Sequence, residues 1–157
     1  MGPLPQSIVD FFKMQPFVLV STLDAKGNIH CAAKGIVSIE AEGKVCLADL
    51  YRGTTFNNLK KSPVASITAV DEPKFRGYTL KGKASIVERE GFDDSLIRTW
   101  EEKLVQRISA RVIKSVQRQK EAGHHPEVHL PPVQYVIALK VEEIVDLTPA
   151  HIKRTAA

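Results

Sequence analysis

The sequence predicts a mainly β fold of the α+β class: a six-stranded antiparallel β-barrel with three helices. Short runs rich in β-branched and apolar residues recur along the chain, and turns containing glycine join them, which favours antiparallel pairing. Residues 76–87 alternate apolar and polar side chains, as expected of a strand with one buried face. Residues 92–119 instead repeat apolar side chains about every four positions, which indicates one long amphipathic helix before the last strand.

A short helix and four strands are expected before residue 50. Residues 7–14 carry apolar side chains at helical spacing and end before Pro16, which disfavours a continuing helix. Gly27 and Gly43 lie in turns between strands, and Gly35 marks a bend or bulge between the second and third strands. The four strands are expected at residues 17–22, 29–34, 35–40 and 45–49.

The strand pattern breaks after the fourth strand. Thr54 or Thr55 can cap a short helix there, and Ser62-Pro63 ends that helix. Gly123 is expected to end the long helix. The remaining strands are expected at residues 64–70, 76–87 and 133–141, which makes seven strand segments in the sequence for a barrel of six strands. Because no internal repeat or second core is visible, we expect a single domain over residues 1–157.

The composition is typical of a globular protein, with 157 residues, 43% hydrophobic and 25% charged side chains. No apolar run approaches the roughly 18 residues of a membrane span, and the N-terminus lacks the features of a secretion signal. We therefore expect a cytoplasmic location, with Cys31 and Cys46 as buried thiols rather than a disulfide. The net charge of +4 suits either nucleic acid or small anions such as phosphate esters.

The segment after the fourth strand has the groups that a phosphate site requires. Backbone N–H groups at a helix start, hydroxyl groups and a fixed cation can together hold a phosphate. The candidate residues are Arg52, Thr54, Thr55 and Asn58. The alternative is that the threonines only cap the helix and that Arg52 is solvated.

The order and spacing of several motifs resemble a known family. A helix leads into Phe17–His30, a strand ends at Asp49, and a Gly-Thr-Thr-Phe-Asn-Asn-Leu helix follows. Next come Ser62-Pro63-Val64-Ala65-Ser66-Ile67 and Leu80-Lys81-Gly82-Lys83-Ala84. Together these motifs resemble the pyridoxamine 5'-phosphate oxidase-like family of FMN-binding split barrels, over about residues 7–90 and more loosely in the last strand.

The resemblance implies a split β-barrel homodimer with FMN held in two grooves at the subunit interface. It implies that the flavin ring lies beside the second and third strands and that the phosphate lies after the fourth. Many relatives have Lys or Arg where this chain has Thr54, so Arg52 or Lys34 would supply the charge. The expected cofactor-binding residues are Cys31, Ala32, Ala33, Lys34, Asp49, Arg52, Thr54, Thr55 and Asn58.

The function implied is that of an FMN-dependent oxidoreductase acting on an unknown small substrate, with NAD(P)H as a possible reductant. The C-terminal segment that binds substrate phosphate in true pyridoxamine phosphate oxidases is absent from the sequence. A non-enzymatic flavin protein for electron transfer or sensing is the alternative. A deazaflavin or haem could also replace FMN, with His30 or the histidines of residues 124–129 as haem ligands.

Two further groups of residues, a basic row and a set of histidines, are weaker evidence for a function. A basic row follows one side of the long helix: Lys103, Arg107, Arg111, Lys114 and Arg118. A solvated face explains this row most simply, although it could meet nucleic acid or the phosphate of a nucleotide. No aromatic residues interleave with it, so we do not expect nucleic-acid binding. His124, His125 and His129 lack the regular spacing of a metal site, so we expect no metal.

Overall fold

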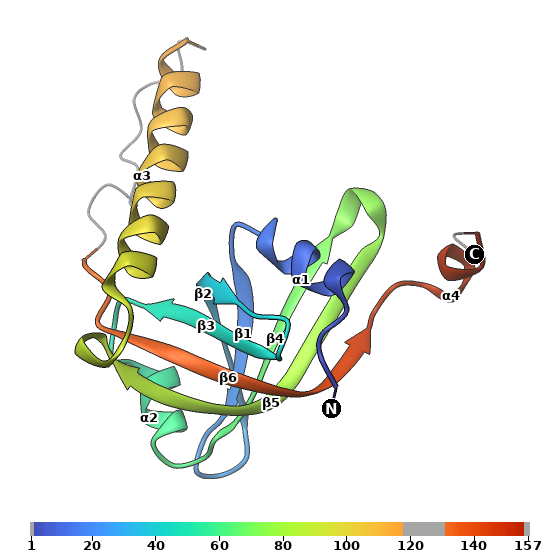
Figure 1. Cartoon of the computed structure of the whole chain (residues 1–157), viewed down its shortest axis with the longest axis horizontal. Helices are drawn as coiled ribbons and strands as arrows, with labels where there is room; N and C mark the ends of the chain where they lie inside the picture. Colours follow the sequence, from blue (N-terminus) through green and yellow to red (C-terminus); the bar gives the residue numbers. More distant parts are fainter. Residues whose placement is uncertain (1, 118–130, 156–157) are drawn as a thin grey trace.

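The structure, a computed structural model, describes residues 2–117 and 131–155, with side chains over 2–110 and 131–153. Six antiparallel strands close into a barrel in the order β1-β2-β3-β6-β5-β4 (Figure 1). The strands are β1 (Val18–Leu23), β2 (Ile29–Ile39), β3 (Lys44–Asp49), β4 (Val64–Asp71), β5 (Arg76–Glu88) and β6 (Tyr135–Asp146). The α-helices are α1 (Gln6–Lys13), α2 (Thr54–Leu59), α3 (Asp94–Gln117) and α4 (Ala150–Thr155).

The predicted mainly β barrel is confirmed, but the elements differ in detail. Residues 29–34 and 35–40 form the single strand β2, whose register shifts between Ile36 and Ser38 and not at Gly35. Residues 150–155 form α4, a helix that the sequence pattern did not predict. The last strand also runs on to Asp146. The predicted end of the long helix at Gly123 lies outside the described residues.

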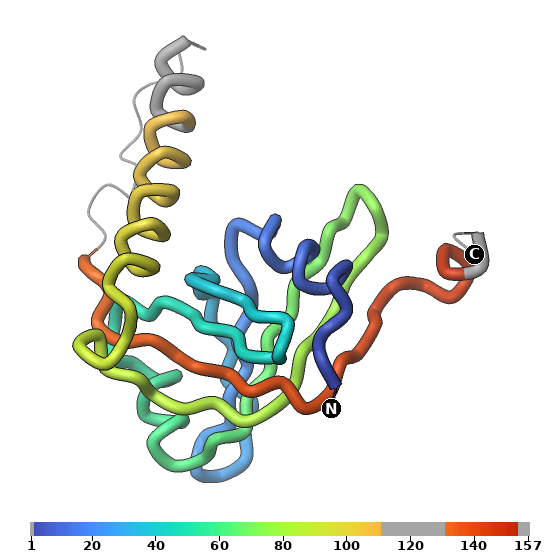
Figure 2. Tube along the Cα trace, in the orientation of Figure 1, coloured from blue at the N-terminus to red at the C-terminus, as the bar shows by residue number. Residues whose placement is uncertain are grey.

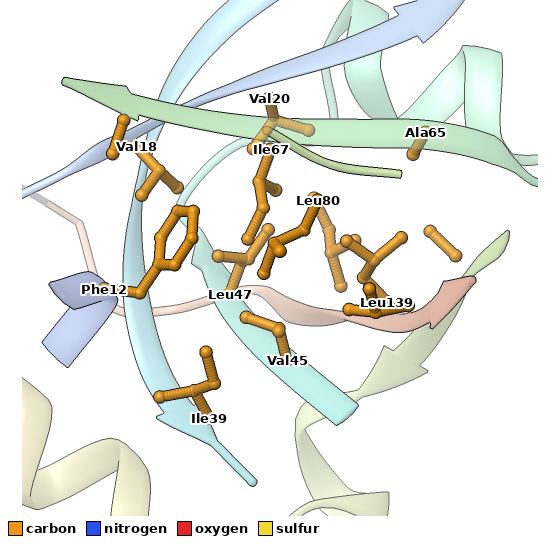
Figure 3. Close-up of a cluster of buried hydrophobic side chains, with 14 of the residues drawn as sticks. Phe12, Val18, Val20, Ile39, Val45, Leu47, Ala65, Ile67, Leu80 and Leu139 are labelled. Atoms are coloured by element: carbon orange, nitrogen blue, oxygen red, sulfur yellow. The ribbon is translucent and has the colours of Figure 1, made fainter. Parts of the chain in front are cut away.

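Alternate side chains of the strands fill the barrel interior (Figure 3). Residues such as Val20, Leu47 and Ile67 are fully buried there, which is the period-2 pattern expected of strands with one dry face. The helix α1 covers one end of the barrel with Phe12, which has no exposed surface, and α2 lies at the other end (Figure 1).

A second apolar cluster attaches α3 to the outside of the barrel. Ile97 and Trp100 of α3 pack with Cys46, Ala48 and Val136 of β3 and β6. Beyond these first turns α3 runs away from the barrel (Figure 2), and Val105 of its apolar stripe is 59% exposed. The stripe that predicts the helix is therefore only partly buried within one chain.

Gly35 allows α3 to approach β2 closely. A Cβ atom at this position would lie 2.5 Å from Cζ2 of Trp100, a distance at which the atoms would overlap. The glycine is therefore explained by the indole that packs on it and not by a bend in the strand.

The two cysteines have different environments. Cys46 is buried, as predicted, and burial raises the pKa of its thiol. The prediction for Cys31 is wrong, because its side chain is exposed at an outward-facing position of β2, opposite Ser21 of β1. Both thiols are free. Within residues 2–117 and 131–155, no helix is long and apolar enough to cross a membrane.

Candidate functional site

A groove of about 380 Å³ lies on the outside of the barrel between α3 and the adjoining parts of β2 and β3. We call it the α3 groove. Its lining residues are Pro16, Phe17, Ala33, Lys34, Gly35, Ala48, Asp49, Leu50, Tyr51, Trp100, Leu104, Arg107 and Ile108. Its volume lies within the range typical of small-molecule sites.

The shape of the α3 groove follows from small side chains on two paired strands. Gly35 and Ala48 are direct partners in the β2–β3 ladder, and Ala33 lies two residues along the same strand. Because neither alanine extends beyond a methyl group, this part of the groove is a flat surface of backbone and methyl groups. The Trp100 indole packs on Gly35 and Ala48 is 3% exposed, so the open part of this surface lies toward Ala33.

A buried ion pair borders one end of the α3 groove. The Lys34 Nζ atom lies 2.6 Å from Oδ1 of Asp49, and the two side chains are 14% and 2% exposed. Lys34 lies opposite Val18 of β1, and Asp49 lies opposite Tyr135 of β6. Residues that lie directly opposite each other point to the same side of a sheet, and Val18 and Tyr135 are core residues, so both charged side chains point toward the barrel interior. A buried charge is costly without partners, so the lysine and the carboxylate each depend on the other.

Tyr135 completes the hydrogen bonding of the Asp49 carboxylate. Its hydroxyl donates to Asp49 Oδ2 at 2.5 Å, and the backbone N–H of Tyr51 donates to Oδ1 at 3.3 Å. Burial, reinforced by the hydrogen bond to Asp49, raises the pKa of the Tyr135 phenol far above its ordinary value. The phenol therefore remains a donor at physiological pH and holds the carboxylate in place.

Arg52 lies beside this network at the start of α2. Its guanidinium donates to both carboxylate oxygens of Glu88, one of them at 2.9 Å. It also lies over the rings of Phe56 and Tyr135, 4.9 and 5.6 Å from their centroids. The hydrogen bond from Arg52 lowers the pKa of the Glu88 carboxyl, so the pair is ionised at neutral pH.

The structure brings together only some of the predicted cofactor-binding residues. Ala33, Lys34 and Asp49 line the α3 groove. Cys31 and Ala32 lie farther along β2 and are not among the described residues that line it. The groove lining also does not include the residues predicted after the fourth strand: Arg52, Thr54, Thr55 and Asn58.

The four residues at α2 divide into two exposed and two buried side chains. Arg52 and Thr54 are exposed, whereas Thr55 and Asn58 are 2% and 5% exposed. The Asn58 Nδ2 atom donates to Thr22 Oγ1 at 3.0 Å, which attaches α2 to β1. The alternative that a threonine caps the helix is wrong, because Gly53 is the N-cap and no side chain bonds there. Arg52 is not simply solvated either, since Glu88 holds it.

Sequence reasoning missed Tyr135, Trp100 and Glu88 as site residues. In the sequence, Trp100 is one of the apolar residues that repeat within 92–119, and Tyr135 lies in the strand expected at 133–141, although a buried phenol requires a hydrogen-bond partner. Lys34 and Asp49, each a charged residue within an otherwise apolar strand, were the available signal for a buried network. Only the barrel closure shows that Tyr135 is the direct cross-strand partner of Asp49.

The basic row and the histidines are described only in part. Arg107 Nη1 donates to the backbone oxygen of Pro16 at 2.9 Å, which ties α3 to the segment after α1. The side chains of Arg111, Lys114 and Arg118, and the residues His124, His125 and His129, lie outside those described. His30 and His151 are described, and neither lines the α3 groove. Among the described residues, no group of three or more His, Cys, Asp or Glu side chains could hold a metal ion.

Solved structures with the same fold come from several bacteria. HupZ of Group A Streptococcus is 18% identical, with a TM-score of 0.65, over 92% of this chain and 94% of that protein. A protein from Clostridium acetobutylicum, of the pyridoxinephosphate oxidase family and related to general stress protein 26, is 14% identical, with a TM-score of 0.58. The match covers 94% of this chain and 95% of that protein. HutZ, the heme storage protein from Vibrio cholerae, is 16% identical, with a TM-score of 0.52, over 91% of this chain and 94% of that protein.

These identities are too low to transfer an activity, so the structures agree on the fold alone. No curated protein is similar enough in sequence to count as a relative. The family model described as pyridoxamine 5'-phosphate oxidase matches residues 4–146, which is most of the barrel and its helices. The chain therefore belongs to the pyridoxamine 5'-phosphate oxidase family.

Proposed function

We propose that this protein is a homodimeric FMN-binding oxidoreductase that acts on a small substrate. The flavin ring would lie in the α3 groove and its phosphate near Arg52 and Thr54. The observation that carries the proposal is the mostly apolar α3 groove outside the barrel, bordered by the strand positions of Lys34 and Asp49, whose ion pair lies on the inner side of the same strands.

The residues of the α3 groove suit a flavin ring. A flavin requires a flat apolar slot with a few polar groups at its edge, and the groove offers apolar walls around a methyl and backbone surface. The Lys34 side chain points into the barrel and pairs with Asp49, so it would act on the ring indirectly, by fixing the ends of β2 and β3 that border the groove. When bound, FMN supplies hydride transfer, while the protein positions the ring and excludes water.

The start of α2 supports the phosphate part of the proposal. Leu50 and Tyr51 line the α3 groove, and Arg52 follows them directly in the chain. The first turn of α2 has no side-chain cap, and the Thr54 side chain is exposed. Asn58 would act indirectly, because its bond to Thr22 fixes α2 on the barrel. The Arg52 guanidinium already donates hydrogen bonds to the Glu88 carboxylate, so a phosphate would compete with this carboxylate for Arg52.

An uncharged outer face supports the homodimer. The β1–β2–β4 face comprises outward-facing side chains of three neighbouring strands: Leu19, Ser21, Ile29, Cys31, Ala33, Val64, Ser66, Thr68 and Val70. Leu19, Val64 and Val70 are 44%, 50% and 60% exposed. Large exposed apolar side chains gathered on an uncharged face are typical of interaction sites. Ala33 belongs both to this face and to the α3 groove, so a second copy on the face would adjoin the groove.

The absorption spectrum of the protein after incubation with FMN and desalting tests the proposal. We expect flavin bands in near-equimolar amount, and we expect Lys34→Met to weaken FMN binding, because it leaves Asp49 as an unpaired buried charge and disturbs the strand ends beside the groove. Lys26→Met, in the exposed turn before β2, is the matched control. A folded protein that retains no flavin would overturn the proposal.

Haem is a second candidate, favoured by the fold that the chain shares with the heme storage protein HutZ. Neither described histidine lines the α3 groove, so an axial ligand would come from His124, His125, His129 or a second subunit. Incubation with haemin separates the two candidates. An intense Soret band that disappears when these three histidines are replaced by alanine would favour haem over FMN.

A further inference from the structure

Three lysines lie side by side on the outside of the barrel, one on each of the neighbouring strands β3, β6 and β5 (Figure 1). Lys140 of β6 is the direct cross-strand partner of Lys44 on one side and of Lys83 on the other. On each strand a residue next to the lysine is buried in the core, so the alternation of the strand turns the lysine outward. All three side chains are exposed.

Glu40 extends this line of lysines by one position and carries the opposite charge. It faces Lys44 across the β2–β3 turn, where its backbone N–H donates to the Lys44 carbonyl oxygen at 2.9 Å. Because Ile39 before it is buried in the core, Glu40 also points outward, and it is exposed. We call these four residues the charged row, in the order Lys83, Lys140, Lys44 and Glu40.

The charged row lies in a shallow hollow of about 580 Å³ on the surface of the sheet. All four of its residues line this hollow, together with Ser85 and Ala138. The helix α3 packs on the neighbouring part of the same sheet face, through Cys46 and Ala48. The hollow therefore adjoins the covered part of the face, and it shares no described lining residue with the α3 groove.

The lysines of the charged row repel one another, because like charges directly opposite on a sheet are unfavourable. Within the part of the chain that the structure describes, none of the three takes part in an ion pair. The same two strands carry a compensated position nearby, where Lys81 and Glu143 are direct partners and their charged groups lie 3.2 Å apart. A partner that brings carboxylates to the charged row would relieve this repulsion.

The length of the charged row matches one face of an α-helix. Neighbouring strands lie about 4.8 Å apart, so the four positions span about 14 Å. Four side chains on one face of a helix, separated by three or four residues, span about 15 Å at a rise of about 1.5 Å per residue. Four side chains on one face of an extended strand would span about 20 Å. A helical ligand therefore fits the spacing better than an extended one.

The acidic end of the charged row disfavours a uniform polyanion such as nucleic acid. Glu40 lies at that end and Glu42 also lines the hollow, so both would repel a continuing line of phosphates. No aromatic side chain is among the described residues of the lining, so bases would have nothing to stack on. A polypeptide can reverse its charge from one position to the next and can match the whole row.

We propose that the charged row binds an acidic α-helix of a partner protein. Three carboxylates on one face of that helix would meet Lys83, Lys140 and Lys44, and a basic side chain at its end would meet Glu40. The inference does not depend on the proposed flavin, because the hollow and the α3 groove are separate.

The probe is a fluorescently labelled helical peptide with three glutamates and then one lysine on one face. Its anisotropy, measured in titrations at low ionic strength, reports binding. We expect saturable binding that salt suppresses. Lys140→Gln, at the centre of the row, should weaken binding about threefold, and replacing all three lysines by glutamine should weaken it about thirtyfold, as expected for exposed ionic contacts.

A second peptide, in which glutamate replaces the lysine, tests the order of charges. Attraction to the net charge of +4 alone would make the parent protein prefer this all-acidic peptide. We expect the parent to prefer the mixed peptide about threefold instead, and Glu40→Lys to reverse the preference. Lys26→Gln removes the same charge from a distant exposed turn and should change nothing. Lys140→Gln relieves repulsion, so its midpoint of thermal unfolding should not fall below that of the parent.

The inference is overturned if neither peptide binds saturably, if the parent prefers the all-acidic peptide, or if Lys26→Gln weakens binding as much as Lys140→Gln does. Tighter binding of a mixed-sequence oligonucleotide, with the same dependence on Lys140, would overturn it in favour of a nucleic-acid surface. A change of mass in light scattering for Lys140→Glu would overturn it in favour of a contact between copies of this chain.

Discussion

Asp49 is a buried carboxylate at the end of β3 that connects three other residues of the site. It accepts hydrogen bonds from Tyr135 and from the backbone of Tyr51, and it forms the ion pair with Lys34. The charge it places inside the barrel is tolerable only because each oxygen has a donor. Removing one donor should therefore affect both stability and ligand binding.

Tyr135→Phe removes the hydroxyl donor and leaves one oxygen of Asp49 without its partner. We expect the free energy of unfolding to fall by about 1–3 kcal/mol, and FMN binding to weaken because Lys34 is less firmly held. Urea unfolding with and without FMN measures both effects. Tyr51→Phe is the matched control, because Tyr51 contacts Asp49 through its backbone and its side chain is 61% exposed. Equal losses in the two variants would contradict the role given to Tyr135.

Glu88→Gln should increase the affinity for FMN relative to riboflavin, because Arg52 is then released for the phosphate. The pKa of Glu88 lies below its ordinary value of 4.5, so the Arg52–Glu88 pair is present above the unfolded-state pKa. The pair is lost as the pH falls through the lowered pKa of the folded protein. The advantage of the variant should thus be full at neutral pH and disappear in acid. The ratio of FMN to riboflavin dissociation constants, measured across this pH range, checks the prediction.

At the scale of the elements, α3 meets β2 at Gly35. Replacing this glycine by alanine would place Cβ 2.5 Å from Trp100 Cζ2, so the indole or the start of α3 must move. We expect an altered Trp100 emission spectrum and a loss of about 1–3 kcal/mol of stability from overpacking. Gly53→Ala is the control, since nothing lies within 4 Å of a Cβ there. A Gly35→Ala variant with unchanged emission and stability would show that the contact is unimportant.

The strands and helices could be predicted from the sequence wherever the burial of one face gives the apolar side chains a regular spacing. β5 alternates because one of its faces lies against the barrel core, whereas the repeat of α3 continues past the first turns that pack on the barrel. Gly35 was misinterpreted because the reason for a glycine was a tryptophan 65 positions later, and a local pattern cannot contain that contact. α4 was missed because six residues hold too little periodicity to recognise.

Only those parts of the candidate site that depend on residues close together in the sequence could be predicted. Lys34 and Asp49 were identified, and both line the α3 groove. Their link to Tyr135 joins residues 86 positions apart, and no spacing rule connects them. Thr55 and Asn58 were chosen for their chemistry, but α2 turns both side chains inward, which depends on how the helix packs against β1.

At the scale of the whole molecule, no helix within residues 2–117 and 131–155 covers one side of the barrel. The helices α1 and α3 pack on other parts, and the β1–β2–β4 face remains open with Leu19 and Val70 exposed. In the proposed homodimer, a second copy of the chain would cover this face.

Leu19→Lys should convert the proposed dimer into monomers, because it places a charge in the middle of the uncharged face. Light scattering measures the mass of the protein in solution, and the amount of FMN retained after desalting measures binding at the proposed site. We expect both to fall in this variant. Phe75→Lys, a substitution of a similarly exposed side chain in the turn before β5, should leave both unchanged. A Leu19→Lys protein that remains dimeric would remove the β1–β2–β4 face as the interface.

The barrel closes through β6, which inserts between β3 and β5. While a ribosome is still making the chain, β3 and β5 each have an unpaired edge, and no earlier strand can take the place of β6. Tyr135, the first residue of β6, also arrives too late to donate to Asp49 before that moment. Loading of the proposed flavin would therefore follow synthesis of the last strand, and a nascent chain that stalls before β6 would expose two unpaired strand edges.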